Sequence, residues 1–155
     1  MKKNKTIQLS GQVLIDASAV NVWNVVKQFG NIAAYHPMVK ASHAINDEVA
    51  LGARRYCQLL PTGVMEEEVV EWEEGRKIVA EVTGGKMLPP CHFMNGILEL
   101  KPQQNRTQVT FTFSYQMKYG WLGNLMNRFM IEPQFKKAPV KYVNGLKHYL
   151  ESGFN

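Results

Sequence analysis

Few residues in this sequence stand where catalytic or metal chemistry would need them. The histidines fall on separate segments, without the close spacing by which side chains share a metal ion. They are His36, His43, His92 and His148. No phosphate-binding glycine loop, zinc-protease motif or serine nucleophile elbow occurs. The sequence therefore predicts no catalytic constellation, no metal site and no cofactor.

A cluster of six glutamates lies within residues 66–74. In an extended strand Glu66 and Glu68 share one face, and if that face is inward their carboxyls enter an apolar interior and their pKa values rise. A bulge would instead turn Glu67 and Val69 inward, and a solvated acidic edge strand is a third interpretation. The register stays open, and we predict Glu66 and Glu68 as ligand-binding residues.

Three ring side chains allow either a structural or a ligand-binding role. His36 stands before Pro37, where it either holds a turn or lies at the mouth of a cavity. His92 opens a strand after a connection rich in proline and glycine, as a surface residue or as a polar contact at a pocket lid. Tyr115 lies on the apolar face of the last strand, where a buried phenol needs a partner in the core or on a ligand.

Two adjacent arginines add one further possibility. Arg54 and Tyr56 share one face of an expected strand, and Arg55 and Cys57 share the other. An arginine on the inward face would anchor a carboxylate through its forked donors. The spacing does not decide which arginine that is.

The elements that position these residues follow from the apolar pattern. Residues 6–15 alternate as a strand with one wet face, and 16–18 offer N-cap side chains for a helix that ends at Gly30. A short helix or turn over 31–35 follows. Short connections rich in turn residues then separate six strands of an antiparallel meander. These strands are 39–47, 52–60, 64–73, 77–83, 92–101 and 106–117.

The C-terminal segment carries a helical apolar stripe. Its first residues follow the spacing i, i+3, i+4, i+7 and i+8: Leu122, Leu125, Met126, Phe129 and Met130. The stripe continues from residue 135 to residue 150, and Pro133 and Pro139 predict a kink or break. The class is therefore α+β, in the order β-α-α-β-β-β-β-β-β-α, with a long terminal helix on the dry face of a seven-stranded sheet.

This order of elements, together with several short sequence segments, resembles the START-like or SRPBCC superfamily, which has the helix-grip fold. The matching segments are Ile15–Trp23, Phe29–Ile32, Tyr35-His36-Pro37, Glu68–Trp72, Leu98–Pro102 and Leu146–Glu151. The family often has Trp before His-Pro, where this chain has Tyr35. The resemblance implies one ligand-binding domain over residues 1–155, with a curved sheet wrapped around the C-terminal helix and a cavity between them.

The small residues Gly11, Ala80 and Gly96 would leave room in such a cavity, and eight methionines suit an adaptable apolar wall. The predicted ligand-contacting residues are Tyr35, His36, Tyr56, Glu66, Glu68, His92, Met94, Phe113, Tyr115, Met117, Leu125 and Phe129. We expect a protein that binds or carries a hydrophobic small molecule, such as a lipid, an isoprenoid or an aromatic polyketide. One alternative is a polyketide cyclase or aromatase that uses His92, Tyr115, Glu66 or Glu68 as cavity acid–base residues. The other is an interaction module.

The chain carries a net charge of +5, and its basic residues are too dispersed to favour nucleic acid. The segment 121–123, with Lys118 and Arg128, either contacts a membrane surface or packs down as an entry turn. No apolar run approaches the length of a membrane span, and the basic start over residues 1–5 has no apolar region after it. We therefore expect a cytoplasmic protein with reduced thiols at Cys57 and Cys91, and the oligomeric state is left open.

Overall fold

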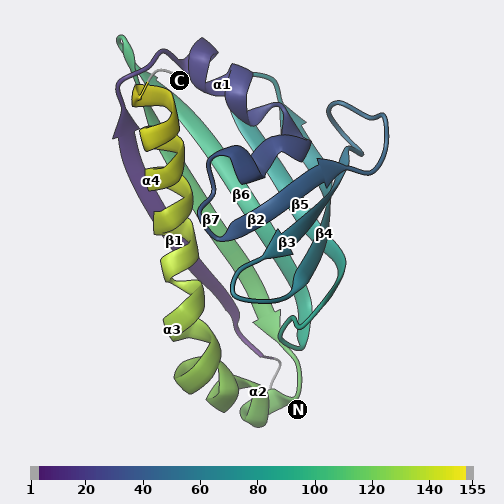
Figure 1. The fold of residues 1–155 in the computed structure, drawn as a ribbon. Helices are drawn as coiled ribbons and strands as arrows, with labels where there is room; N and C mark the ends of the chain where they lie inside the picture. Colours follow the sequence, from purple (N-terminus) through teal and green to yellow (C-terminus); the bar gives the residue numbers. More distant parts are fainter. Residues whose placement is uncertain (1–3, 153–155) are drawn as a thin grey trace.

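Seven strands form one antiparallel sheet in the order β1-β7-β6-β5-β4-β3-β2 (Figure 1). The strands are β1 (Thr6–Ile15), β2 (Val39–Ala44), β3 (Arg54–Leu59), β4 (Val64–Glu73), β5 (Lys77–Lys86), β6 (Cys91–Gln103) and β7 (Arg106–Met117). The computed structural model describes residues 4–152. Residues 1–3 of the basic start, and 153–155, lie outside the described residues.

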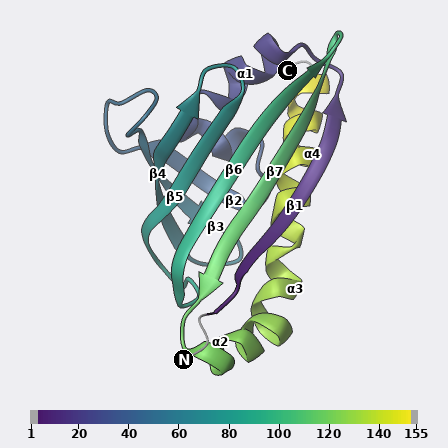
Figure 2. The same cartoon turned by 180° about the vertical axis from the view of Figure 1, so that it is seen from behind.

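The helices lie on one side of this sheet, and Figure 2 shows the sheet in front of them from the other side. They are α1 (Ala19–Val26), η1 (Phe29–Ala34), α2 (Gly120–Met126), the π-helical turn η2 (Asn127–Ile131), α3 (Glu132–Phe135) and α4 (Lys137–Glu151). The Ser18 hydroxyl caps α1 by accepting from the Asn21 amide at 3.2 Å. The order and the seven-stranded antiparallel sheet confirm the predicted helix-grip fold, while a domain over exactly 1–155 stays a prediction.

The long C-terminal helix is interrupted where prolines were expected to interrupt it. Pro133 and Pro139 each stand in the first turn of a new helix, α3 and α4, where a missing N–H is tolerated. We call residues 120–136, which comprise α2, η2 and α3, the arm. Figure 1 shows the arm curving away from the line of α4 toward the end of the molecule that holds the N-terminus.

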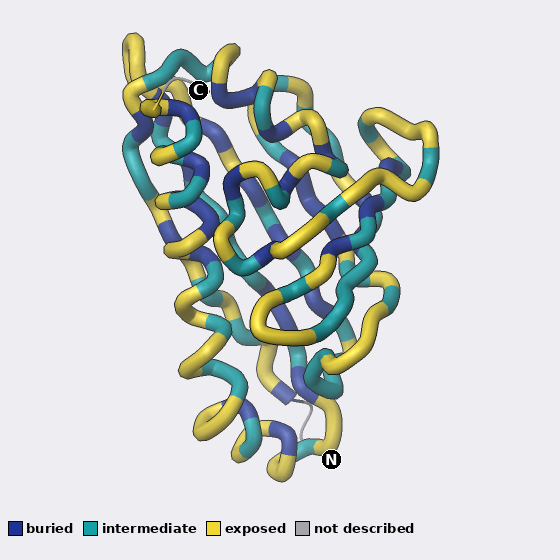
Figure 3. Tube along the Cα trace, in the orientation of Figure 1, coloured by how far each residue is buried: buried dark blue, intermediate teal, exposed yellow. Residues whose placement is uncertain are grey.

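Two apolar clusters fill the space between the sheet and the helices. The main core joins α1, η1 and α4 to the sheet and includes Val22, Phe29, Val69, Leu98 and Leu146. The second core lies under the arm, where Met94, Tyr115 and Met117 are buried. The arm covers it with Met126, Ile131 and Phe135, which are only partly buried. In Figure 3 the tube is mostly exposed or intermediate along the arm and buried along the inner strands.

Two glycines bring α4 into backbone contact with its neighbours. A Cβ on Gly11 of β1 would lie 2.7 Å from the Pro139 carbonyl carbon, and one on Gly145 would lie 2.1 Å from the Tyr35 carbonyl oxygen. Any side chain at either position would collide with main chain that cannot rotate away. Gly11 therefore allows α4 to approach β1 closely and does not leave the open space that was expected from it. The contacts at Gly11 and Gly145 clamp α4 in place.

Candidate functional site

The pairing of β3 with β4 decides which charged residues enter the interior. Arg55 stands directly opposite Glu67, while Arg54 stands opposite Glu68. Glu67 shares its face of β4 with Val69, which was one of the interpretations left open, but no bulge of β4 separates Glu66 from Glu67, because the register shift there skips Thr83 on the β5 side. Glu67 and Arg55 are consequently inward and only 5% and 7% exposed. Glu66 and Glu68 turn outward, so the alternative with these two carboxyls inside is wrong.

Arg55 and Glu67 form a buried ion pair. Arg55 Nε donates to Glu67 Oε2 at 2.6 Å, and Nη1 donates to the Phe29 carbonyl oxygen at 3.1 Å. The guanidinium carbon lies 3.9 Å from the centre of the Phe29 ring, which adds a cation–π contact. Burial alone would lower the pKa of Arg55, but the Glu67 carboxylate outweighs it and raises that pKa above its usual value. The guanidinium of Arg55 is therefore charged at any physiological pH.

Two phenols and a histidine extend this polar centre toward α4. The hydroxyls of Tyr35 and Tyr142 lie 3.2 Å apart and share a hydrogen bond. Burial raises the pKa of both, so both stay protonated. The His36 ring packs edge-on against Tyr142, and burial, with the charges of Arg55 and Lys141, lowers its pKa to about 4.

The interior beside this centre holds a void of about 20 Å³, which is room for one water molecule. It is lined by Val26, Phe29, Arg55, Glu67, Ile78, Ala80, Gly96, Leu98, Phe111 and Tyr142. Pockets for small molecules run to about 300–1,000 Å³. The ligand-sized hollow expected from Ala80 and Gly96 is therefore not confirmed, and the Phe111 ring occupies the space beside Gly96.

The inner face of the sheet is nevertheless not fully covered. Several inward-facing apolar residues between the ion pair and the arm remain partly exposed: Leu59, Met65, Val82, Phe111 and Phe113. Beyond them, the Tyr115 hydroxyl donates to Asn127 Oδ1 on the arm, and burial raises the pKa of Tyr115 to about 12. This bond ties the arm to β7.

A larger depression of about 650 Å³ lies on the outside, beneath the loop between β2 and β3. Its walls include Phe29, Val49 and Trp72, with charges of both signs from Lys27, Arg54, Asp47, Glu48 and Glu74. None of the predicted ligand-binding residues lines it.

The structure divides the predicted ligand-contacting residues into two groups. Those in the interior are Tyr35, Met94, Phe113, Tyr115 and Met117, with His36 half-buried beside Tyr142. Those directed elsewhere are Tyr56, Glu66, Glu68, His92, Leu125 and Phe129. Whether any of them contacts a ligand stays a prediction.

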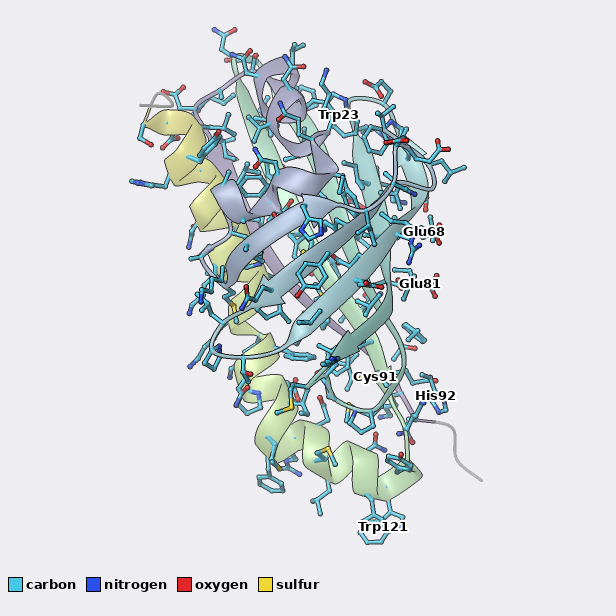
Figure 4. All side chains as sticks on the ribbon, turned by 45° about the vertical axis from the view of Figure 1, so that its right-hand side comes forward. Trp23, Glu68, Glu81, Cys91, His92 and Trp121 are labelled. Carbon is cyan, nitrogen blue, oxygen red and sulfur yellow. The ribbon has the colours of Figure 1, made fainter. Side chains whose placement is uncertain are left out.

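Specific outward partners account for several members of the second group. Tyr56 stacks on His43 with ring centres 5.0 Å apart, and Arg54 lies 3.8 Å from Glu66. Figure 4 shows Glu68 and Glu81, which face each other across β4 and β5, on the side of the sheet away from the helices. The sequence offered Glu67 only as an alternative to Glu66 and Glu68, and it did not predict Phe29, Tyr142 or Asn127 as site residues. The apolar neighbours Cys57 and Leu59, on the face of Arg55, were the signal for the inward arginine.

Within residues 4–152, no three His, Cys, Asp or Glu side chains come together as a metal site. None of the helices in that range is long and apolar enough to cross a bilayer.

Solved structures share the helix-grip architecture of this chain. Ara h 8.0201 superposes with a TM-score of 0.76 at 9% identity, covering 96% of this chain and 100% of its own. A START superfamily protein from Mycobacterium smegmatis gives 0.72 at 14% identity, covering 94% and 97%. The Zhui aromatase/cyclase from Streptomyces sp. R1128 gives 0.76 at 16% identity, covering 97% of each chain. At these identities the likeness shows the fold alone.

The family follows from the sequence profile described as polyketide cyclase / dehydrase and lipid transport, which matches residues 6–151. The chain belongs to this family. A search of curated proteins finds no match.

Proposed function

We propose that this protein binds a hydrophobic small molecule with an oxygen-bearing polar group on the inner face of the sheet, and that Arg55 holds the polar group. The observation that carries the proposal is the Arg55–Glu67 pair, a buried charged centre beside a void in the interior. Burying two charges costs desolvation energy, and apolar residues of similar volume are often at least as stabilising. Such a pair is therefore better explained by recognition of a ligand than by stability.

The geometry leaves Arg55 able to recognise a ligand without losing its partner. The Glu67 and Phe29 bonds use Nε and Nη1 of the guanidinium, which carries five N–H donors. Nη2 can therefore donate to a carbonyl, carboxylate or phenol oxygen. The Tyr142 hydroxyl, beside the same void, offers a second polar contact.

A bound ligand needs more space than the void supplies. The arm is the element that can move to create that space. Only Gly123 is buried in α2, only Asn127 in η2, and α3 has no buried residue. By contrast, the clamps at Gly11 and Gly145 hold α4 in place. We infer that the arm moves outward from the second core, where Met94 and Met117 supply an adaptable wall.

The family description, which includes lipid transport, supports a binding role. An acid–base cyclase has less support, because three of its four expected groups, Glu66, Glu68 and His92, face away from the interior. The fourth, Tyr115, has its hydroxyl engaged by Asn127.

The test uses 8-anilinonaphthalene-1-sulfonate, an aromatic anion with sulfonate oxygens, as a fluorescent probe. The double variant Arg55→Met with Glu67→Met should fold and should bind the probe about tenfold more weakly, since it loses a charge-assisted hydrogen bond. The control is Arg54→Met with Glu66→Met, which removes the outward pair at 3.8 Å and should bind like the wild type. Equal affinity in both double variants, or no binding by the wild type, would refute the proposal.

A further inference from the structure

We propose that the arm docks on the surface of a bilayer that contains anionic lipids. The proposal starts from large apolar side chains that the arm directs into solvent. Trp121 is 73% exposed, Phe129 is 67% exposed and Leu125 is 49% exposed. Tyr119, Leu122 and Met130 are exposed beside them. Figure 4 shows Trp121 at the far end of the molecule, pointing away from the sheet.

These residues form one continuous face, because Trp121, Leu125 and Phe129 are four residues apart along a helical segment. Soluble monomers rarely expose so contiguous an apolar patch unless it meets a partner or a membrane. We call these six residues, Tyr119, Trp121, Leu122, Leu125, Phe129 and Met130, the arm face.

The packing of the arm prevents the arm face from turning inward. A Cβ on Gly123 would lie 1.7 Å from the Lys118 carbonyl oxygen, so this side of α2 rests directly on main chain. About one turn later, Asn127 is buried and accepts a hydrogen bond from the Tyr115 hydroxyl. The fully buried residues of α2 and η2 are thus a glycine and an amide, with Met126, Ile131 and Phe135 of the arm only partly buried beside them, while the large apolar residues of the arm face point outward.

The charges around the arm face fit an anionic surface. Lys118, Arg128, Lys136 and Lys137 are all exposed, and the acidic residue within 118–137, Glu132, is half-buried within 3.4 Å of the Asn127 amide. Lys5 and Lys86 are also exposed, in segments that flank this end of the sheet. Exposed basic residues next to Trp, Tyr and Leu are the side chains that favour the headgroup region of anionic membranes.

The loop between β5 and β6 extends the same surface. The Lys118 amide donates to the Pro90 carbonyl oxygen at 2.9 Å, which holds this loop against the start of the arm. Met87, in the loop, is 78% exposed. A second copy of the chain suits the surface less well, since a two-fold interface would set the same cations against one another.

Vesicle co-sedimentation tests the proposal with phosphatidylcholine alone and with about one third phosphatidylserine. We expect binding to the mixed vesicles that weakens with added salt, together with a blue shift of Trp121 emission. The double variant Trp121→Ser with Phe129→Ser should bind about tenfold more weakly, as should Lys118→Glu with Arg128→Glu.

Matched controls remove the same chemistry elsewhere. Val49→Ser with Leu51→Ser acts on exposed apolar residues of the loop between β2 and β3, and Lys40→Glu with Lys101→Glu reverses two exposed cations. Both should bind like the wild type.

The proposal is overturned if the wild type does not bind the mixed vesicles, or if the arm variants and the controls bind equally. It is also overturned if light scattering shows a dimer that the Trp121 and Phe129 substitutions dissociate, because a second copy then occupies the arm face. None of these outcomes depends on the interior ligand, so failure here leaves the proposed function standing.

Discussion

At the scale of single residues, Glu67 has the most demanding environment in the protein. It is buried, and its charge is balanced by one guanidinium at 2.6 Å. Glu67→Gln leaves Arg55 buried without a counter-charge, so we expect a loss of about 3–5 kcal/mol in the free energy of unfolding, measured by urea denaturation. The double variant Arg55→Met with Glu67→Met should recover most of that loss. Glu66→Gln, in the exposed pair with Arg54, should cost no more than about 1 kcal/mol.

His36 makes the stability of the protein depend on pH. Its pKa is lowered to about 4 from an ordinary 6.5, first by burial and then by the charges of Arg55 and Lys141. Above pH 6.5 the ring is neutral in both the folded and the unfolded chain, so it has no effect. As the pH falls from 6.5 toward 4, only the unfolded chain takes up the proton, and stability should fall by up to about 3 kcal/mol.

Chemical denaturation at several pH values checks this expectation. His36→Gln should flatten the loss over that range, whereas His92→Gln, at an exposed position, should leave it unchanged. An unchanged slope in His36→Gln would contradict the assignment.

At the scale of elements, helix propensity and close packing have opposite requirements at Gly145, where α4 contacts the end of η1. Alanine normally stabilises a helix relative to glycine by up to about 1 kcal/mol. At position 145, however, the added methyl group would collide with the Tyr35 carbonyl oxygen. Gly145→Ala should therefore lower the melting temperature, while Asn144→Ala, at the exposed position beside it, should leave it equal or slightly higher. A melting temperature in Gly145→Ala at or above the wild-type value would show that α4 can shift freely.

Alternation and turn residues were sufficient to predict the strands, because one face of each strand is apolar and the other is wet. The inward face of β4 was not predictable, because Val70 is an extra residue in the pairing with β5. Simple alternation would place Trp72 on the face of Glu66 and Glu68, but this bulge brings Trp72 to the inward face with Val69. The alternation of residues along β3 was a better guide to which charged residue faces inward. Arg55 shares its face with Cys57 and Leu59, and Glu67 lies opposite Arg55 across the hairpin.

The arm shows a second limit of periodicity. Leu122, Leu125 and Phe129 have the spacing of a core-facing stripe, yet they are exposed. A repeat of apolar residues defines one face of a helix but not what covers that face. The small and polar residues between them, Gly123 and Asn127, were the better indicators of the side that meets the protein.

At the scale of the whole molecule, the arm and the rest of the fold should differ in local stability. Tyr115→Phe removes the hydroxyl that donates to Asn127, so hydrogen exchange over 120–136 should become faster while exchange in α4 and β7 stays slow. Mass spectrometry of the exchanged peptides measures both regions in one experiment. Tyr56→Phe is the matched control, since that ring lies on the outer face against His43. Equal acceleration across the whole chain would show that the bond supports global stability instead of holding the arm.

The absence of a side chain at positions 11 and 145 sets how near α4 can come to the strand and the turn it touches. A relative with alanine, serine or anything larger at the equivalents of both positions has to seat that helix further out and so enclose a wider interior. The residue types at these two positions of a sequence alignment therefore predict which members of the family have a small interior cavity and which have a large one, without a structure. They also mark where a designer would begin to enlarge this protein's own binding space.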